Sequence, residues 1–406
     1  MTIQLTSIQE FTSDGAWCFF ADPRALYYEG RHRRTYAGWL SSAGDVWIGC
    51  FDHTLGTNRS FLIRPALQQD DHANPSLYID DAGHITIFYS AHNGDSMYYR
   101  RTQLPEDLSS FGAEQTLPAN TSGHYGYTYP TPVYLAAERQ LYLFWRGGNF
   151  KPNFSVTSDL ELNAWSPVRT LIMDKGQRPY IRYASNGRDT IHFACTDGHP
   201  NVEPSNSIYY ARYAKGAVYR ADATLVKQMA DLPLEIAELE IVFDGKAAGR
   251  NAWIWDIAHD EQGNPVIVYA VFNSLEDHRY YYSRWAGGRW VTNELTAAGR
   301  WFPRTPQGAV ETEPYYSGGI ILDHGDPSVV FLSREVNGVF EIERWQTEDL
   351  GATWSSAPVT ASSPCHQVRP FLTRGGRDGH TLLFWMSGEY VHYTKYRTSL
   401  RCSMPE

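Results

Sequence analysis

The sequence predicts an all-β protein, and three observations lead to this fold class. Polar and apolar residues alternate with the period of strands nearly throughout, while helical spacing is weak and confined to residues 219–239. Aromatic residues make up 14% of the 406 residues, with 27 Tyr and 13 Trp, which favours strands. A short apolar, aromatic-rich run recurs seven times, at intervals of about 50 to 75 residues. Four-stranded sheets that repeat in this way are typical of a β-propeller. We therefore predict seven blades in a single domain, residues 1–406, whose ring closes between the N- and C-terminal ends.

Each repeat is expected to contain a first strand, a tight turn, a second strand and one or two outer strands. The second strands begin, in chain order, at Thr35 (TYAGWL), Ile85 (ITIFYS), Gln140 (QLYLFW), Thr190 (TIHFAC), Pro265 (PVIVYA), Ser328 (SVVFLS) and Thr381 (TLLFWM). Turn signals such as DDAGH, AAERQ, SNGRD and DEQGN precede them, and SMYYRRT, SIYYARY, RYYYSRW and FEIERWQ read as outer strands. The absence of a helical partner in each repeat favours a propeller over a solenoid.

Two turns have the form of an Asp box, S/T-x-D-x-G-x-T-W. Residues 346–354, QTEDLGATW, match it well, and residues 157–165, TSDLELNAW, are a degenerate copy. Such turns cap the outer strands of propellers, so we assign them a structural role and no catalytic one.

Composition restricts the partners. The net charge of −10 and the lack of a Lys/Arg run argue against nucleic acid and anionic membranes as ligands. No apolar run approaches the ~20 residues of a membrane span. Five scattered cysteines without CxxC spacing predict neither a disulfide framework nor a zinc ribbon. The first residues show no signal-peptide pattern, so we expect a soluble, monomeric, cytoplasmic protein as written, and an extracellular one if a leader has been removed.

Functional side chains are expected on one face of the ring. Because the first two strands of a blade are antiparallel, the beginning of the first strand and the end of the second strand lie on the same face of the ring. Those positions hold Asp22-Pro23-Arg24 in blade one, Asp70, Asp71, His72 and His92 in blade two, Tyr127, Tyr129 and Arg146 in blade three, Arg178, Tyr180, Cys195, Asp197 and His199 in blade four, Trp255 and Asp256 in blade five, Tyr315 and Tyr316 in blade six, and Arg369 in blade seven. Convergent polar groups of this kind predict a ligand site, although an Arg or Asp at a strand end can also simply tie neighbouring blades together.

An arc of His72, His92, Tyr129 and Arg146 suits β-elimination from a uronic acid. An arginine fork would pair with the carboxylate, where negative charge builds up when the C5 proton is removed. A His or Tyr would take that proton, and a second would protonate the departing O4. Tyr129 would need a cationic neighbour such as Arg146 to act as the base.

Other chemistries fit the residues less well. No facing pair of carboxylates for a glycosidase and no GxSxG nucleophile turn is evident. His72, His92, Cys195 and His199 could instead be metal ligands, but their spacing matches no standard zinc motif.

Several segments resemble the BNR-4 type seven-bladed propellers, which include ulvan lyases and lyases that cleave rhamnose–glucuronate linkages. They are DDHANPSL, FYSAHN, YPTPVYL, LFWRGGNFKPNFS, RPYIRY, SGGIILD and TEDLGATW, and they extend over nearly the whole chain. The resemblance implies a catalytic centre of His92, His72, Tyr129 and Arg146, with Arg146 on the uronate carboxylate and Tyr127 as a rival of Tyr129.

Further residues of the predicted face are candidates for substrate binding. We expect Arg178, Tyr180, Tyr127, His199 and Trp255 to bind substrate. No cofactor is expected to be required. Some relatives carry a histidine shortly after the arginine that helps to hold a structural metal; Phe150 stands nearby here, which argues against such a Ca²⁺ or Zn²⁺ ion.

Three functions remain open at this point. The leading prediction is a lyase that cleaves a rhamnose–glucuronate linkage in a poly- or oligosaccharide and leaves a 4,5-unsaturated uronate. The second is a glycoside hydrolase, α-L-rhamnosidase-like or sialidase-like, in which Arg24, Arg146, Arg178 and Arg369 would imitate an arginine cluster. The third is a carbohydrate-binding propeller without activity. The sequence favours His92 for proton transfer with His72 beside it, and does not divide the acid and base roles.

Overall fold

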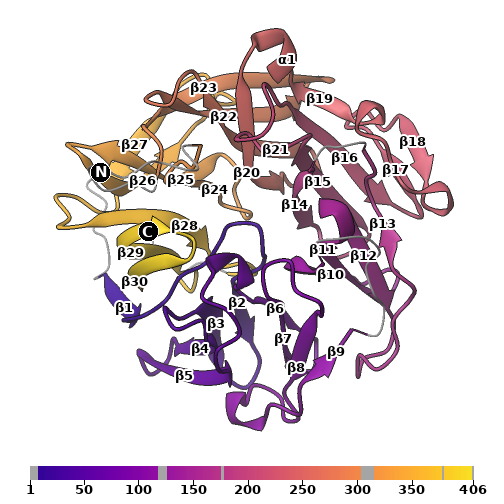
Figure 1. The fold of residues 1–406 in the computed structure, drawn as a ribbon, viewed down its shortest axis with the longest axis vertical. Coiled ribbons are helices and arrows are strands. Elements are labelled where there is room, and N and C mark those ends of the chain that lie inside the picture. Colours follow the sequence, from indigo (N-terminus) through magenta and orange to yellow (C-terminus); the bar gives the residue numbers. More distant parts are fainter. Residues whose placement is uncertain (1–7, 118–125, 175–177, 303–314, 377–378, 405–406) are drawn as a thin grey trace.

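Seven antiparallel sheets stand around a central axis in the computed structural model (Figure 1). The structure describes residues 8–117, 126–174, 178–302, 315–376 and 379–404. Successive segments of the chain form successive sheets, so neighbours in sequence are neighbours in the ring. The predicted all-β, seven-bladed fold is confirmed.

The strands follow the predicted repeats. Blades one to three contain β2 (Ala25–Glu29), β3 (Arg33–Leu40), β4 (Val46–Asp52) and β5 (Thr57–Arg64); β6 (Ser76–Ile79), β7 (Ile85–Tyr89), β8 (Tyr98–Arg101) and β9 (Gln115–Thr116); and β10 (Thr128–Leu135), β11 (Gln140–Arg146), β12 (Pro152–Thr157) and β13 (Arg169–Thr170). Blade four contains β14 (Tyr180–Ser185), β15 (Thr190–Thr196), β16 (Ile208–Ala214), β17 (Ala217–Tyr219), β18 (Leu225–Gln228) and β19 (Glu240–Phe243). Blades five and six contain β20 (Asn251–His259), β21 (Pro265–Phe272), β22 (His278–Ala286) and β23 (Arg289–Gly299), then β24 (Ile320–Leu322), β25 (Val329–Val336), β26 (Val339–Gln346) and β27 (Ser355–Pro358).

The last blade contains both ends of the described chain. Its sheet order is β28 (His366–Leu372), β29 (Leu383–His392), β30 (Lys395–Ser403) and β1 (Gln9–Thr12). Strand β1 is antiparallel to β30, with Gln9 opposite Cys402. Backbone hydrogen bonds between the first strand and the last strand thus close the ring.

Helices are few and short. They comprise α1 (Gly245–Ala248) and five 3₁₀ turns, η1 (Asp71–Ala73), η2 (Leu108–Ser110), η3 (Gly148–Phe150), η4 (Met229–Asp231) and η5 (Ile236–Glu238). No helix in the described part of the chain is long and apolar enough to cross a membrane.

The weak helical signal of residues 219–239 is wrong. This segment forms the end of the β17–β18 hairpin followed by η4 and η5. Leu234 exchanges backbone hydrogen bonds of 2.8 Å with Leu171 and Met173 of blade three, and its side chain is buried there. Contacts with the neighbouring blade therefore override a local preference that was weak to begin with.

The central channel is filled by the N-terminal segment. Residues 16–24, here called the channel segment, form the indigo loop that crosses the centre of Figure 1. The Phe19 ring stacks on Trp255 of β20 with 3.8 Å between centroids, and the Phe20 ring packs against Tyr180 of β14 at 5.0 Å. The same segment corrects the expectation that Asp22 lies with the polar residues of the predicted face: its buried carboxylate accepts a hydrogen bond from Arg182 in mid-strand β14.

Both Asp boxes have the expected structural role. The Asp349 carboxylate accepts hydrogen bonds from the backbone and hydroxyl of Thr353, and the Trp354 indole donates to the Gly351 carbonyl at 3.0 Å. In the degenerate copy Trp165 donates to the Leu162 carbonyl at 2.9 Å, so the turn keeps its geometry without the glycine.

Phe19→Ala tests whether the channel segment supports the ring. Because Phe19 is only 1% exposed and stacks on Trp255, we expect the variant to lose about 3–5 kcal/mol of unfolding free energy in urea titrations. The matched control, Leu225→Ala on an exposed strand, should change it by no more than about 0.5 kcal/mol. Equal effects for the two variants would contradict a supporting role.

Candidate active site

His72 and His92 are neighbours on one face of blade two. His72 lies in η1, just before the first strand β6, and His92 follows the antiparallel second strand β7. Their rings stack with 4.3 Å between centroids and an interplanar angle of 8°. The hairpin arrangement expected from the repeat thus brings the two imidazoles together.

The Asp70 carboxylate bridges the two histidines. Its Oδ1 accepts from His72 Nδ1 at 2.7 Å, and its Oδ2 accepts from His92 Nδ1 at 2.8 Å. Oδ1 also accepts from the His72 backbone N–H, which caps η1 and fixes the direction of the bridge. A carboxylate only accepts, so both Nδ1 atoms carry protons and both Nε2 atoms face away from Asp70.

The two histidines that share this carboxylate have pKa values shifted in opposite directions. Burial alone would lower the pKa of His72, but the charge and hydrogen bond of Asp70 outweigh it, and the pKa is raised. Burial and the neighbouring charge of His72 lower the pKa of His92 to about 4. Burial would raise the pKa of Asp70, yet His72 and the two hydrogen bonds hold it well below its usual range. The site thus pairs His72, whose protonated form is favoured by Asp70, with His92, which is neutral near neutral pH and whose Nε2 has a free lone pair.

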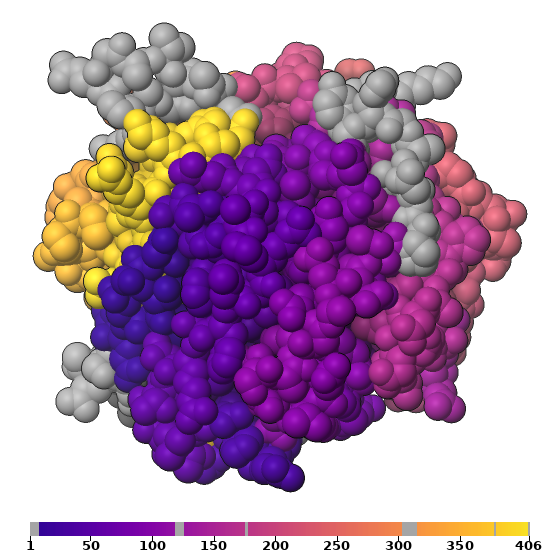
Figure 2. Space-filling model, turned by 60° about the horizontal axis from the view of Figure 1, so that its bottom comes forward, coloured from indigo at the N-terminus to yellow at the C-terminus, as the bar shows by residue number. Residues whose placement is uncertain are grey.

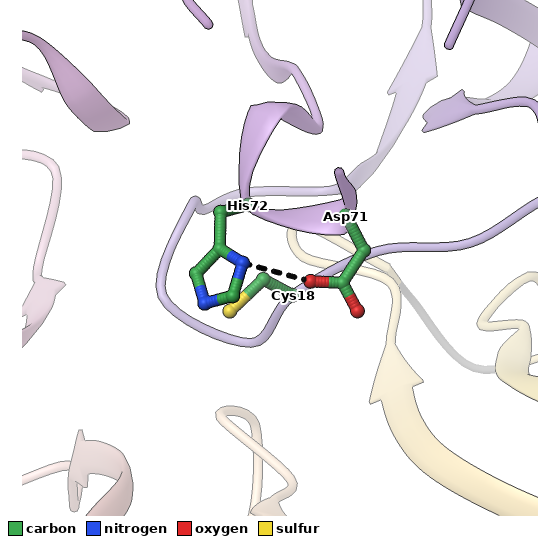
Figure 3. A group of neighbouring side chains, drawn as sticks. All are labelled: Cys18, Asp71 and His72. Atoms are coloured by element: carbon green, nitrogen blue, oxygen red, sulfur yellow. Dashed lines mark ion pairs between the residues drawn. The ribbon is translucent and has the colours of Figure 1, made fainter. Parts of the chain in front are cut away.

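The second acid of the DDH segment faces the core instead. Asp71 Oδ1 lies 3.2 Å from His72 Nδ1, with Cys18 alongside (Figure 3). Its Oδ2 accepts from Arg369 at 2.5 Å and from the Tyr390 hydroxyl. Asp71 therefore ties blade two to blade seven and supports His72 from behind.

The described residues fit a metal ion poorly. Two groups of possible ligands lie close enough together among them, Cys18–Asp71–His72 and Asp70–His72–His92. In the first, burial raises the pKa of the Cys18 thiol to about 12, and Arg369 already occupies the carboxylate. In the second, both carboxylate oxygens are taken by imidazole protons. The predicted set of His72, His92, Cys195 and His199 is not assembled: Cys195 is buried in a separate apolar cluster of blades three and four.

Arg146 is a buried cation without a carboxylate partner. It ends β11 and is 6% exposed. Its guanidinium donates to the Tyr180 hydroxyl and to Asn93 Oδ1, each at 3.0 Å, while its Nε is buried without a hydrogen bond. No carboxylate of the described residues pairs with it within 4.0 Å. A buried charge is costly unless it is paired, so this arrangement favours an anionic ligand.

Tyr129 faces the same space, but not as a base. A bulge between Thr128 and Thr131 and a φ of 61° at Tyr129 turn its ring toward the Arg146 guanidinium, whose carbon lies 4.7 Å from the ring centre. Arg146 does lower the pKa of Tyr129, as expected, yet burial outweighs it and holds this pKa well above 10. The hydroxyl stays protonated near neutral pH and suits a proton donor.

Three of the predicted substrate-binding residues continue the site into blade four. The Arg178 guanidinium carbon lies 4.2 Å from the centre of the Phe150 ring, and the Tyr180 hydroxyl accepts from Arg146. The His199 ring packs edge-on against Trp253 at 4.8 Å, and its Nδ1 accepts from the Asn201 backbone at 3.1 Å. Burial and nearby Arg178 lower the pKa of His199 to about 3, so this ring is neutral and can donate from Nε2.

With this geometry in view, the comparisons with known proteins decide the family. The model of the BNR repeat-containing family, BNR_4, matches residues 34–298. The chain belongs to this family. No curated protein sequence matches it.

Solved structures show the same fold as this BNR propeller. One is an ulvan lyase of polysaccharide lyase family PL25 bound to -[GlcA(1-4)Rha3S]-, with a TM-score of 0.72 and 15% identity over 97% of this chain and 95% of that one. The polysaccharide lyase Uly1 has a TM-score of 0.63 and 11% identity over 99% and 100% of the two chains. The BP39L lectin from Burkholderia pseudomallei has a TM-score of 0.52 and 10% identity over 94% of each chain.

Two residues expected to bind substrate, Trp255 and Tyr127, are buried inside this BNR propeller. Trp255 is 2% exposed and stacks on Phe19 in the channel, so its ring is not available to a sugar. Tyr127 is also 2% exposed and packs against Trp145 between blades two and three. Residues two positions apart in a regular strand would face the same side. Tyr127 precedes β10, however, and the bulge with the φ of 61° at Tyr129 turns the second ring toward the site.

Sequence reasoning missed two groups that complete the site. Tyr393, in the turn between β29 and β30, stands edge-on to His72 at 4.6 Å and to His92 at 6.0 Å. Asp70 was noted only as a loop acid and given no role. The acid two positions before His72 was a signal for the bridge, whereas nothing local connects Tyr393 with residues some 300 positions earlier.

Asp70→Asn should reduce the difference between the pKa values of His72 and His92. In the wild type we expect His92 to titrate near pH 4 and His72 above its ordinary 6.5, as read from NMR shifts of the ring protons. Without the carboxylate the pKa of His72 should fall, because burial then prevails. The control Asp81→Asn, in an exposed turn of the same blade, should leave both titrations in place. An unchanged His72 in Asp70→Asn would contradict the bridge.

Proposed function

We propose that this protein is a polysaccharide lyase that cleaves a rhamnose–glucuronate linkage by β-elimination and leaves a 4,5-unsaturated uronate. The observation that carries this proposal is the buried Arg146, without a carboxylate partner among the described residues, beside the stacked pair of His72 and neutral His92. A cation that lacks a carboxylate, next to a base and proton donors, is what abstraction of a proton α to a carboxylate requires.

Arg146 would bind the uronate carboxylate. Its guanidinium is held by neutral oxygens of Tyr180 and Asn93, which orient it without cancelling its charge. When the C5 proton leaves, negative charge moves onto the carboxylate, and the preoriented guanidinium stabilises that charge more strongly than it does the ground state.

Proton transfer would divide between different groups. Neutral His92 takes the C5 proton on Nε2, the C5–H electrons form the C4–C5 double bond, and the C4–O4 bond breaks. The departing O4 receives a proton from a protonated neighbour. Asp70 raises the pKa of His72 and so favours its protonated form, and burial keeps Tyr129 a phenol, so either group can serve as the donor.

The similar solved structures support the substrate class. The PL25 ulvan lyase is described with a bound glucuronate–rhamnose 3-sulfate chain, and Uly1 is described as a polysaccharide lyase. A hydrolase mechanism with two carboxylates has less support at this site. Both oxygens of Asp70 are bound to histidines, and Asp71 is paired with Arg369 inside the core.

Arg146→Lys tests the carboxylate role. Lysine keeps the charge but loses the fork, so kcat/KM for glucuronate–rhamnose oligosaccharides should fall about 10²- to 10³-fold in an ultraviolet assay for the unsaturated product. His84→Ala replaces a histidine of the same blade that bonds the Thr102 carbonyl, and should keep wild-type activity. Retained activity in Arg146→Lys would contradict a bidentate carboxylate contact.

The pH profile tests the acid–base assignment. The acid limb of kcat/KM should lie near pH 4, because protonation of His92 below that pH removes the base. A basic limb above the ordinary pKa of histidine but below pH 10 assigns the donor to His72, whose pKa is raised, and activity that persists to pH 10 assigns it to Tyr129. An acid limb at the ordinary pKa of histidine would contradict His92 as the base.

The products separate the three functions. A lyase yields ultraviolet-absorbing ends in proportion to reducing ends. Reducing ends without that absorbance would identify a hydrolase. A binding protein would turn over nothing, and its His92→Ala variant would bind oligosaccharide as the wild type does.

A further inference from the structure

A second cavity lies on the same face as the histidines, between blades seven and one. It has a volume of about 460 Å³, and its lining includes Ser42, Gln69, Glu389, Lys395, Tyr396 and Arg397. The β29–β30 hairpin supplies most of these side chains, so we call it the hairpin cavity. In Figure 2 the yellow surface of this blade borders the indigo and purple surfaces of blades one and two.

Two stretches of chain connect the hairpin cavity with the histidine pair. Gln68 Oε1 accepts from the His92 backbone at 2.6 Å, and the next residue, Gln69, lines the cavity just before Asp70. On the other side, the β29–β30 turn places Tyr393 against His72, and Lys395 follows two residues later. The Tyr393 carbonyl also accepts from the Asp71 backbone at 2.9 Å. A glycan that passes the histidines toward blade seven would therefore enter this cavity.

The charges of the cavity favour an anion. Lys395 and Arg397 are exposed, and neither forms an ion pair or hydrogen bond with the side chains of the described residues. Glu389 lies opposite Arg397 in the β29–β30 register but forms no ion pair with it. These two unpaired cations would attract an anion; Glu389 is the acid among the lining residues, and the Asp14 carboxylate accepts hydrogen bonds from Ser42 on the blade-one side.

We infer that the hairpin cavity binds a second anionic group of the same glycan chain, on the side of the histidine pair away from Arg146. The chemistry is that of an oxyanion on a sugar, either the carboxylate of the next uronate or a sulfate ester. This inference rests on the proposed function, and it makes the enzyme selective for chains with at least two charged sugars.

The test replaces both cations with alanine, Lys395→Ala with Arg397→Ala. We expect KM for oligosaccharides with two or more uronates to rise about fivefold to tenfold with kcat within twofold, because two exposed ion pairs would contribute to binding away from the reacting bond. A substrate with one uronate should be unaffected. The matched control, Arg188→Ala with Lys215→Ala, removes the same charge from two turns of blade four, β14–β15 and β16–β17. Both turns lie on the face opposite the candidate site, so neither KM nor kcat should change.

Sulfated and desulfated oligosaccharides of equal length distinguish the two sources of the anion. If the cavity binds the carboxylate, KM rises equally in the double variant for the sulfated and the desulfated oligosaccharide. If it binds the sulfate, KM rises only for the sulfated oligosaccharide. An unchanged KM for every long substrate overturns the inference while the lyase activity stands. Should no substrate be turned over, calorimetric titration of a sulfated tetrasaccharide still decides: affinity that is equal in the wild type and the double variant overturns the inference, and a fivefold or greater loss supports it.

Discussion

The carboxylate of Asp70 is the interaction on which the candidate site depends. Two imidazoles of similar intrinsic basicity share its two oxygens, and the resulting charge on one suppresses protonation of the other. Burial would make both rings neutral if the acid were absent. Around one buried acid, two identical side chains 4.3 Å apart thus have pKa values shifted in opposite directions.

Arg369 and Arg146 are both buried on this face, but they differ in whether a carboxylate pairs with them. Arg369 is bound to Asp71, to Tyr390 and to the Trp17 carbonyl, so its charge is neutralised within the core and joins blade seven to blade two. Arg146 has comparable burial but only neutral acceptors. Burying a charge without an opposite charge is costly, and the proposed binding of a carboxylate would offset that cost.

The rigidity of the site comes from the way the ring is closed and filled. The channel segment places Phe20 against Tyr129 and Tyr180, and it places Cys18 next to His72. A single loop therefore contacts residues from three blades. The closing contact of β1 with β30 holds the blade that contributes Tyr393. The geometry of the candidate site and the closure of the ring consequently depend on the same packing.

The sequence by itself determined the seven blades, their strand order and the meeting of His72 with His92, because a period of two and antiparallel pairing are local rules. Tertiary structure alone decided what depends on distant packing. It buried Trp255 under Phe19 and Tyr127 against Trp145, brought Tyr393 to the histidines, and raised the pKa of Tyr129 in spite of Arg146. Desolvation and cross-ring contacts depend on residues hundreds of positions apart, and no local pattern in the chain encodes them.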